Sequence, residues 1–395
     1  MNSKKILFII ILFVACSAQI ASDIYSPSIP AIASSLHASI SSVQFSMVIY
    51  MVGLATSQLF YGPLSEGLGR KTPLIIGFSI LFLGNIICLF SSAISFLVIG
   101  RLIQGCGAGA CSALWRSIFR DTFEGAELAK YGAYFSIFIT FIVPAAPALG
   151  GYLQEYFDWR ASFVFLLLYS FSTLIMVIVW LRETSQHHHI EKLNLKFIFN
   201  SYKHMLSSRI FMGYTLCTFV CYGAFFSWFA VGPVLLIHMV GLSPVQFGWI
   251  TLVGGGLATA FGGWVNGRLV TSVGTKVMLR TGFSIMFLAG IFMLSSAMIF
   301  KMNAYIIVIP MMLFYFGVTF IWPSAFAGAF GPFGKMAGYA GALYGFMQIS
   351  GAAVIGMMVS YLPHENQIPL SLVFILASMT AWTSFEKIVN RAQAS

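Results

Sequence analysis

Apolar runs of about 20 residues recur along the whole chain, and each is long enough to cross the ~30 Å hydrocarbon core of a bilayer as a helix. Lipid offers no partners to unpaired backbone groups, so such runs are predicted to be helices that pack side by side. We place twelve spans, at residues 6–32, 43–64, 73–93, 96–116, 132–153, 161–181, 210–238, 245–268, 277–299, 303–325, 336–361 and 369–386. The pattern therefore predicts an all-α membrane protein with twelve transmembrane helices.

The longest polar stretch, residues 182–209, divides the spans into two sets of six. It predicts a solvated cytoplasmic linker between an N-terminal six-helix bundle, residues 1–181, and a C-terminal six-helix bundle, residues 210–395. The linker contains His187, His188 and His189, but adjacent histidines on a loop lack the fixed geometry of a metal site.

The two halves share a motif. Residues 62–71 (GPLSEGLGRK) lie between the second and third spans, and a degenerate copy at residues 267–276 (GRLVTSVGTK) lies between the eighth and ninth. Two equivalent halves, each with a tight Gly-rich basic turn at one membrane face, are what a transporter made of two rocking bundles needs.

Charged residues are scarce and unevenly distributed. Only 8% of the 395 residues are charged, and the net charge of +10 arises from 21 basic residues. Among these, only Arg160 and Lys301 fall in loops on the side opposite the N-terminus, while Arg101 falls within a span. Basic loops are retained in the cytoplasm, so both termini are predicted to be cytoplasmic, and the charge does not indicate a nucleic-acid partner.

The sequence lacks the motifs that nucleotide binding and metal binding require. The sequence has no nucleotide-binding loop of the GxxxxGK[ST] type, so ATP is not expected to drive the protein. The six cysteines all lie within predicted spans and lack the spacing of metal ligands. We therefore expect no metal and no bound cofactor.

Asp23 and Arg101 are the two charged residues that lie clearly inside the membrane. A charge near the bilayer centre costs at least ~2.5–3.5 kcal/mol, so it usually faces a cavity or a partner. The two lie at comparable depth and could face one central cavity. A partly desolvated carboxylate can exchange protons near neutral pH, and a nearby arginine opposes its protonation, so we interpret Asp23 as a proton site. The alternative is a permanent ion pair that fastens two helices.

The fifth span contains Pro144, Pro147, Gly150 and Gly151. Prolines remove backbone donors and glycines leave small surfaces, so this helix is predicted to bend and to let a neighbour move against it.

Three motifs resemble signatures of the major facilitator superfamily, and they occur in the order of that superfamily. They are residues 62–71, residues 101–107 (RLIQGCG) and residues 147–151 (PALGG), of which the third is similar to the signature of drug:proton antiporters. Further motifs resemble the Bcr/CflA-type exporters of bacteria, which confer resistance to bicyclomycin and chloramphenicol. These motifs are residues 22–30 (SDIYSPSIP), Arg120-Asp121, Trp159-Arg160 and residues 246–248 (QFG).

The resemblance implies two six-helix bundles related by an axis along the membrane normal, with a central cavity open to one side at a time. It implies that Asp23 couples transport to protons and that Arg101 modulates its protonation. It also implies a cytoplasmic charge cluster that locks the outward-facing state against the N-terminal end of the eleventh helix. The motif and cluster residues are Gly62, Glu66, Gly69, Arg70, Lys71 and Asp121.

Two features depart from the superfamily pattern. Glu66 stands where the signature usually has aspartate, and no second acidic residue lies in any membrane core. Coupling through one carboxylate suits one proton per cycle and leaves less flexibility with cationic substrates.

Candidate cavity residues come from spans that usually face the cavity in this superfamily. They are Tyr25, Tyr50, Gln104, Tyr222, Phe225, Phe226, Trp228 and Gln348. Apolar surfaces with a few polar groups suit varied amphipathic ligands.

The sequence thus predicts a proton-coupled exporter of small amphipathic compounds in the bacterial inner membrane, working as a monomer with the proton gradient as its energy source. A dedicated transporter of one metabolite such as a siderophore, in either direction, stays open. A channel would not need the paired lock motifs, and a membrane enzyme would need converging His, Asp or Glu residues that the spans lack.

Overall fold

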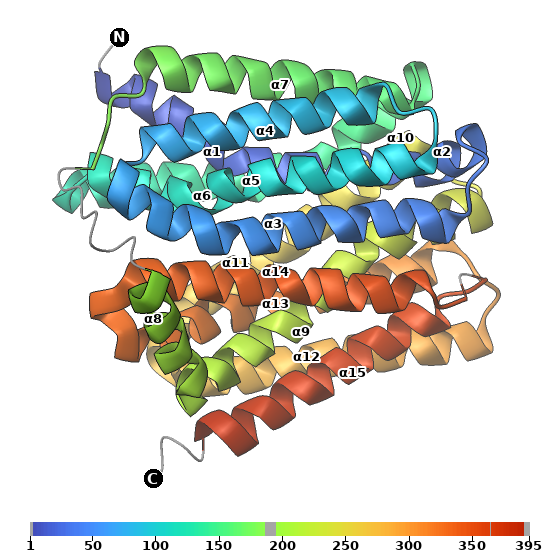
Figure 1. Ribbon diagram of the computed structural model, residues 1–395. Helices are drawn as coiled ribbons and strands as arrows, with labels where there is room; N and C mark the ends of the chain where they lie inside the picture. The colour runs from blue at the N-terminus through green and yellow to red at the C-terminus, as the bar shows by residue number, and fades with distance from the viewer. Residues whose placement is uncertain (1–2, 186–194, 364, 391–395) are drawn as a thin grey trace.

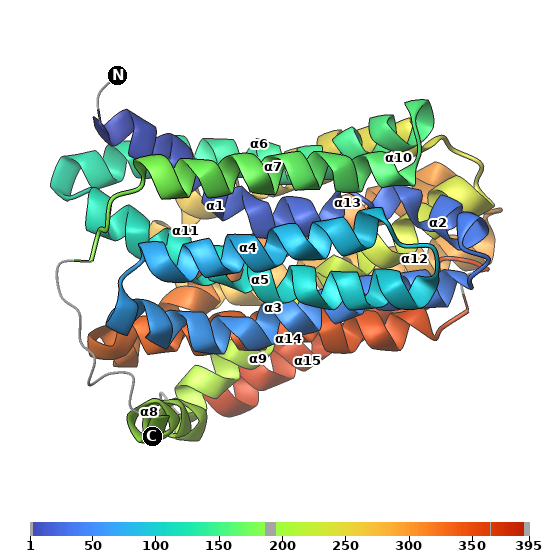
Figure 2. The ribbon, with the colours of Figure 1, turned by 45° about the horizontal axis from the view of Figure 1, so that its top comes forward.

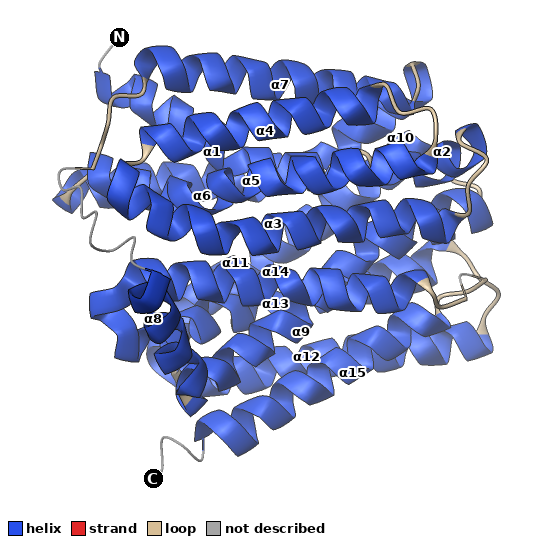
Figure 3. Ribbon diagram, in the orientation of Figure 1, coloured by secondary structure: helices blue, strands red, loops and turns tan. Residues whose placement is uncertain are grey.

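The structure is a computed structural model that describes residues 3–185, 195–363 and 365–390. Within these ranges the chain forms helices joined by short loops and no strand, as Figure 3 shows. The three consecutive histidines of the predicted linker lie outside the described residues.

Among the described residues, the N-terminal half consists of seven α-helices and one short 3-10 helix. In chain order these are α1 (Ser3–Asp23), η1 (Ser26–Ser28), α2 (Ile29–Ser35), α3 (Ile40–Leu68), α4 (Lys71–Leu89), α5 (Ile94–Thr122), α6 (Gly125–Tyr156) and α7 (Trp159–Trp180).

The C-terminal half follows helix α8 (Leu195–Ser207) and contains three π-helical segments and one 3-10 segment. In chain order these are α9 (Arg209–Pro233), η3 (Val234–Met239), α10 (Pro244–Trp249), η4 (Ile250–Gly255), α11 (Gly256–Val273), α12 (Thr275–Ile299), α13 (Ala304–Phe330), η5 (Gly331–Met336), α14 (Ala337–Ser360), α15 (Ile368–Ser384) and η6 (Phe385–Asn390).

Eleven helical segments among the described residues are long and apolar enough to cross a membrane. The remaining predicted span, residues 132–153, lies within α6, a helix of 32 residues. The prediction of helical spans along the whole chain is therefore confirmed. The first span differs in detail, because the α-helix ends at Asp23 and a 3-10 helix begins at Ser26. Pro27 has no N–H to donate to the backbone oxygen of Asp23, four residues earlier, and its ring clashes with that oxygen, so the α-helix cannot continue.

The long helices run roughly parallel and form two groups, as Figure 1 shows: α3, α4 and α7 lie on one side, and α9, α12, α14 and α15 lie on the other. The short helix α10 of the C-terminal half lies on the side of α7 and packs against α6. Both chain ends and α8 lie at the same end of the bundle, which we call the terminal face. The opposite face carries η1, α2 and α10.

Helix α8 is a structural element that the sequence-based prediction of a plain linker missed. It crosses the ends of the other helices at the terminal face, and Figure 2 shows it nearly end-on. Ser201 and Met205 are buried, and the Tyr202 hydroxyl donates to the backbone oxygen of Leu59 on α3, 3.2 Å away. The connection between the halves is thus partly packed against the bundle.

The repeated motif gives the same backbone geometry in both halves. Gly69 ends α3 with φ of 83°, and Gly274 ends α11 with φ of 83° as well. An L-residue with a side chain rarely adopts this left-handed conformation, so glycine is required where each turn reverses the chain.

Candidate functional site

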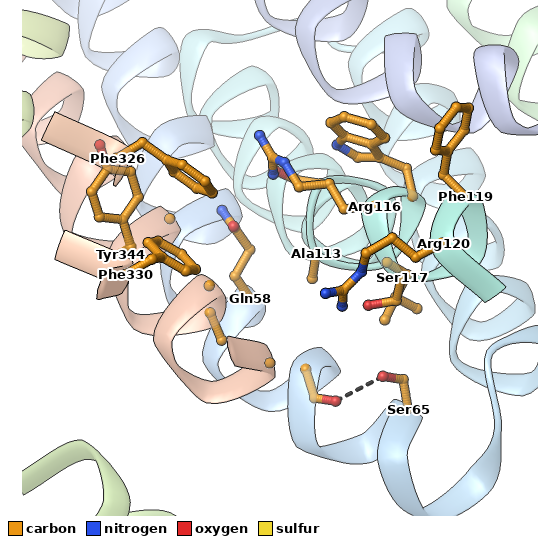
Figure 4. Close-up of a pocket in the computed structure, with 18 of the residues that line it drawn as sticks. Gln58, Ser65, Ala113, Arg116, Ser117, Phe119, Arg120, Phe326, Phe330 and Tyr344 are labelled. Atoms are coloured by element: carbon orange, nitrogen blue, oxygen red, sulfur yellow. Dashed lines mark hydrogen bonds between the residues drawn. The ribbon is translucent and has the colours of Figure 1, made fainter. Parts of the chain in front are cut away.

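Two adjoining cavities lie between the halves, with volumes of about 790 and 510 Å³. The first, drawn in Figure 4, lies toward the terminal face and is lined by α3, α5, α13 and α14. The second lies deeper and includes residues of α1, α6, α9 and η4. Gln58, Trp115, Arg116, Trp322 and Gln348 line both, so the two cavities form one site.

The halves close against each other at the opposite face. A Cβ atom added at Gly248 of α10 would lie 2.6 Å from the Cα of Ala148 in α6. Val245 N–H donates to the carboxylate of Glu155 at 3.1 Å, and the Trp249 indole donates to the Tyr152 hydroxyl at 2.9 Å. The structure therefore shows a state that is closed at the opposite face, with its cavity in the terminal half.

The predicted bend residues of α6 lie at this closed contact. Gly150 packs against the backbone oxygen of Ile24 and Gly151 against that of Pro244, and a Cβ atom on either glycine would overlap the oxygen. Pro144 and Pro147 lie within the continuous helix α6, and Pro144 lines the second cavity. Gly151 therefore lets α6 and α10 approach closely, and the two prolines remove backbone donors from α6.

Three of the eight candidate cavity residues line the site. Tyr222, Phe225 and Gln348 line the second cavity. Gln19 also lines it and donates to the Tyr222 hydroxyl at 3.3 Å, which joins α1 to α9 across the two halves.

The other five candidates lie behind the lining of both cavities, contrary to the sequence-based prediction. Trp228 donates to Thr251 at 3.2 Å and stacks on Phe247, and Phe226 is packed between helices. Tyr25, Tyr50 and Gln104 are fully buried against Arg101. Their large side chains fill the spaces between helices, and a sequence pattern does not distinguish such positions from a cavity wall.

Asp23 is fully buried at the end of α1, where the helix breaks. Neither of its carboxylate oxygens has a hydrogen-bond partner. Asp23 lines neither of the two cavities, so the expectation that it faces the central cavity directly is corrected. It lies one helical turn from Gln19, which does line the cavity.

Arg101 is also fully buried and lines neither cavity. Its guanidinium lies between two tyrosine rings, 4.4 Å from the centroid of Tyr25 and 4.1 Å from that of Tyr50. It donates to the backbone oxygen of Ala21 at 2.7 Å and to the side chain of Gln104. No ion pair joins it to Asp23 among the described residues, so the alternative of a permanent ion pair does not describe this state.

A polar chain extends from Arg101 into the N-terminal half. Gln104 donates to Asn85, and Asn85 donates to the Ser170 hydroxyl at 2.9 Å and to the backbone oxygen of Leu166 at 3.1 Å. All these side chains are buried, so the chain fixes the position of Arg101.

The predicted charge cluster is assembled at the terminal face. The Arg70 guanidinium donates to Asp121 at 3.0 Å, to Glu66 at 3.1 Å and to the Ser65 hydroxyl at 2.7 Å. Burial alone would lower the pKa of Arg70. The two carboxylates have the larger combined effect and raise that pKa above its ordinary value, so the guanidinium stays charged. Glu66 Oε1 would lie 3.6 Å from a Cβ atom at Gly338, so the cluster reaches the start of α14.

Glu183 is a member of this region that the sequence-based prediction missed. Its carboxylate accepts the backbone N–H groups of Arg70 at 2.8 Å and Lys71 at 3.1 Å, and thereby caps the start of α4. Partial burial alone would raise the pKa of Glu183. These two hydrogen bonds, together with those from the backbone of Thr184 and Ser185, have the larger effect and lower the pKa below its ordinary value. Its sequence position, just after a span, gave no signal of this contact.

Arg116 and Arg120, which the charge pattern assigns to the side of the N-terminus, line the cavity that lies toward the terminal face. No group of three or more His, Cys, Asp or Glu side chains that could hold a metal occurs among the described residues.

The comparisons with known proteins cover nearly all of the chain. The sequence model of the Major Facilitator Superfamily matches residues 11–385. The chain is 29% identical to multidrug resistance protein D of Escherichia coli, over 96% of this chain and 94% of that protein. It is 31% identical to the uncharacterized transporter YdgK of Bacillus subtilis, over 92% and 90% of the two chains. It is 28% identical to a chloramphenicol resistance protein of Pseudomonas aeruginosa, over 92% and 85%.

The fold is similar to a solved structure. The xylose transporter XylE from Escherichia coli, in a partially occluded inward-open conformation, superimposes with a TM-score of 0.73 over 98% of each chain at 14% identity. At this identity the likeness supports the fold alone.

Proposed function

This chain belongs to the Major Facilitator Superfamily, and on that premise we propose that it is a proton-coupled exporter of small amphipathic compounds that works by alternating access. It is a multi-pass transporter of the inner membrane and not an enzyme. The resistance functions named for its relatives support drugs as the substrate class.

The observation that carries the proposal is the buried Asp23 carboxylate, both of whose oxygens lack a partner. An unsatisfied carboxylate in a membrane helix is costly unless it binds a proton or meets water in another state. Its position one turn from Gln19, at the cavity, suits a group that gains and loses a proton as the site opens to each side. We propose Asp23 as the coupling residue and Arg101 as the residue that modulates it.

The proposed cycle assigns a role to each face. The terminal face is cytoplasmic, since it holds the basic turn at residues 62–71 and both chain ends. The bundles of residues 1–181 and 210–395 rock about the cavity, and residues 182–209 connect them. The packing of Gly151 against Pro244 closes the outer side, and the Arg70 cluster governs the cytoplasmic side. One chain encloses a complete cavity, so we propose that the monomer is the working unit.

Proteoliposomes with an imposed pH gradient test the proposal. Proton flow down the imposed gradient supplies ~1.4 kcal/mol per proton for each pH unit, so the wild type should move chloramphenicol or another compound of an antibiotic panel against its gradient. Asp23→Asn should abolish this movement, whereas Glu365→Gln, at an exposed acid, should not. Full gradient-driven transport by Asp23→Asn would contradict the coupling role.

A further inference from the structure

The charged side chains of the cavity are mainly basic. Arg116 lines both cavities, and Arg120 lines the first. Among the described residues that line the first cavity, Glu66 is the one acidic residue, and it is bound to Arg70 at 3.1 Å. The lining of the second cavity contains no aspartate or glutamate among the described residues. The electrostatic potential of the site is therefore positive.

Neither arginine of the cavity is neutralised. Arg116 and Arg120 are exposed, and neither forms a hydrogen bond or an ion pair with any described residue. The neighbour of the Arg116 guanidinium is the Trp115 ring, whose centroid is 4.5 Å away. Figure 4 shows Arg116 reaching from α5 toward Gln58 and the side of the cavity formed by α13 and α14. Its hydrogen-bond donors are thus available to a ligand.

Aromatic rings face these guanidinium groups across the cavity. Phe326 stacks on Phe330 with centroids 4.1 Å apart, and Tyr344 meets both rings edge-on. Trp322 extends this surface into the second cavity and contacts Phe225. The site therefore pairs an apolar wall with two unpaired cations, an arrangement suited to a ligand with an aromatic body and an anionic group.

The coupling carboxylate does not offset this charge, because Asp23 lies outside the lining of both cavities. A cationic ligand would meet two arginines and no free carboxylate, and like charges brought together disfavour binding.

We propose that the cavity selects anionic amphipathic compounds, with the carboxylate or sulfonate of the ligand at Arg116 and Arg120 and its apolar part against the rings of α13 and α14. This substrate class rests on the proposed export function. With one proton entering for one monovalent anion leaving, each cycle moves two charges across the membrane. The membrane potential alone should then drive export of such a compound.

The test is a binding series with one apolar body and three head groups. 2-Naphthoate, 2-naphthamide and 2-naphthylmethylamine are titrated at neutral pH into the full chain in nanodiscs of zwitterionic lipid, with protein-free nanodiscs as the blank. The wild type should bind naphthoate most tightly, since a charge-assisted hydrogen bond changes affinity by roughly tenfold or more. Arg116→Gln and Arg120→Gln should each lower the affinity for naphthoate by roughly this factor and leave the affinity for naphthamide nearly unchanged.

The matched control is Arg268→Gln. Arg268 is exposed and lies 4.8 Å from the centroid of the Trp264 ring, so it is also an arginine on a tryptophan, but it lines neither cavity. Arg268→Gln should not change the order of the three ligands. Arg116→Lys keeps the charge and should retain part of the preference for naphthoate. This variant therefore distinguishes an effect of the lost charge from an effect of misfolding.

Equal affinity of the wild type for naphthoate and naphthamide, or tighter binding of the amine, would overturn the anion preference. An equal loss of affinity for all three ligands in Arg116→Gln would also overturn the anion preference. Failure of the export proposal is a separate result: it would appear as absence of gradient-driven transport in proteoliposomes while the preference for naphthoate persists.

Discussion

Gly151 of α6 packs directly against the backbone oxygen of Pro244 at the start of α10, so closely that a methyl group added at Gly151 would overlap that oxygen. These two residues belong to different halves of the molecule, and their contact lies at the closed face. The free energy of this contact therefore contributes to the balance between the state described here and a state in which that face is open.

Gly151→Ala should shift that balance toward the open state. Overpacking by one methyl group costs about 1–3 kcal/mol, which corresponds to a change of roughly 5- to 150-fold in the ratio of the two states. Hydrogen exchange measured by mass spectrometry should increase in residues 239–249 and 148–158. Gly263→Ala is the matched control, because no heavy atom lies within 4 Å of its added Cβ. Unchanged exchange in Gly151→Ala would show that the neighbouring backbone yields without opening the face.

Arg70 and Asp121 should behave as one unit when they are mutated together. Arg70 is nearly buried, so loss of either partner leaves a poorly solvated charge. In a double-mutant cycle of Arg70→Ala and Asp121→Ala, we expect a coupling free energy of about 1 kcal/mol or more. The Arg280–Glu386 pair has its charged atoms 2.6 Å apart, but its side chains are more exposed, so its coupling free energy should be smaller. The cycle can be measured by unfolding in SDS and by transport rate, and additive effects would mean that the two residues act separately.

The helical spans could be predicted because lipid leaves the backbone few alternatives, and a run of apolar residues is then sufficient evidence. The charge cluster could be predicted because residues 62–71 resemble a motif of the superfamily. The same resemblance also implies which part of α5 the motif contacts. The partners of such a motif cannot be predicted when they carry no motif of their own. Glu183 is the example: nothing in the sequence indicates that it caps α4 from more than 100 residues away.

The cavity lining was harder to predict because a membrane helix is apolar on every side. Tyr50 and Tyr222 both lie in spans expected to face the cavity, yet only Tyr222 lines it, whereas Tyr50 is packed against Arg101. Arg116 was missed for the opposite reason. It stands at the edge of the predicted fourth span, where a basic residue usually marks the membrane surface, but α5 continues to Thr122 and carries it along the cavity.

Glu183→Gln should destabilise the protein at neutral pH and have little effect in acid. The folded state holds the pKa of Glu183 below its ordinary value, so the charged form contributes stability above the unfolded pKa of about 4.3 and loses it as pH falls through the lower, folded value. Loss of the charged cap at α4 should cost about 0.5–1 kcal/mol at neutral pH. Melting temperatures of Glu183→Gln and wild type, compared from neutral pH downward, should converge in acid. A constant difference at every pH would exclude the charge as the cause, and Glu365→Gln provides the exposed control.

Arg101 should tolerate lysine poorly although the charge is kept. The guanidinium lies over the rings of both Tyr25 and Tyr50 and donates to Ala21 and Gln104, and an ammonium group cannot reproduce both the contact with the two rings and the directed bonds. A desolvated cation–π contact stabilises by about 2 kcal/mol, so Arg101→Lys should lower the free energy of unfolding in SDS by a similar amount. Tyr50→Phe keeps the ring and loses the 2.6 Å hydrogen bond to Ala18, whereas Tyr50→Leu also loses the ring. We expect Tyr50→Leu to be the more destabilising of the two, and Arg101→Lys to resemble it. If both tyrosine variants lose the same stability, the ring contributes nothing beyond its hydroxyl, and the stacking of Arg101 does not hold the helices together.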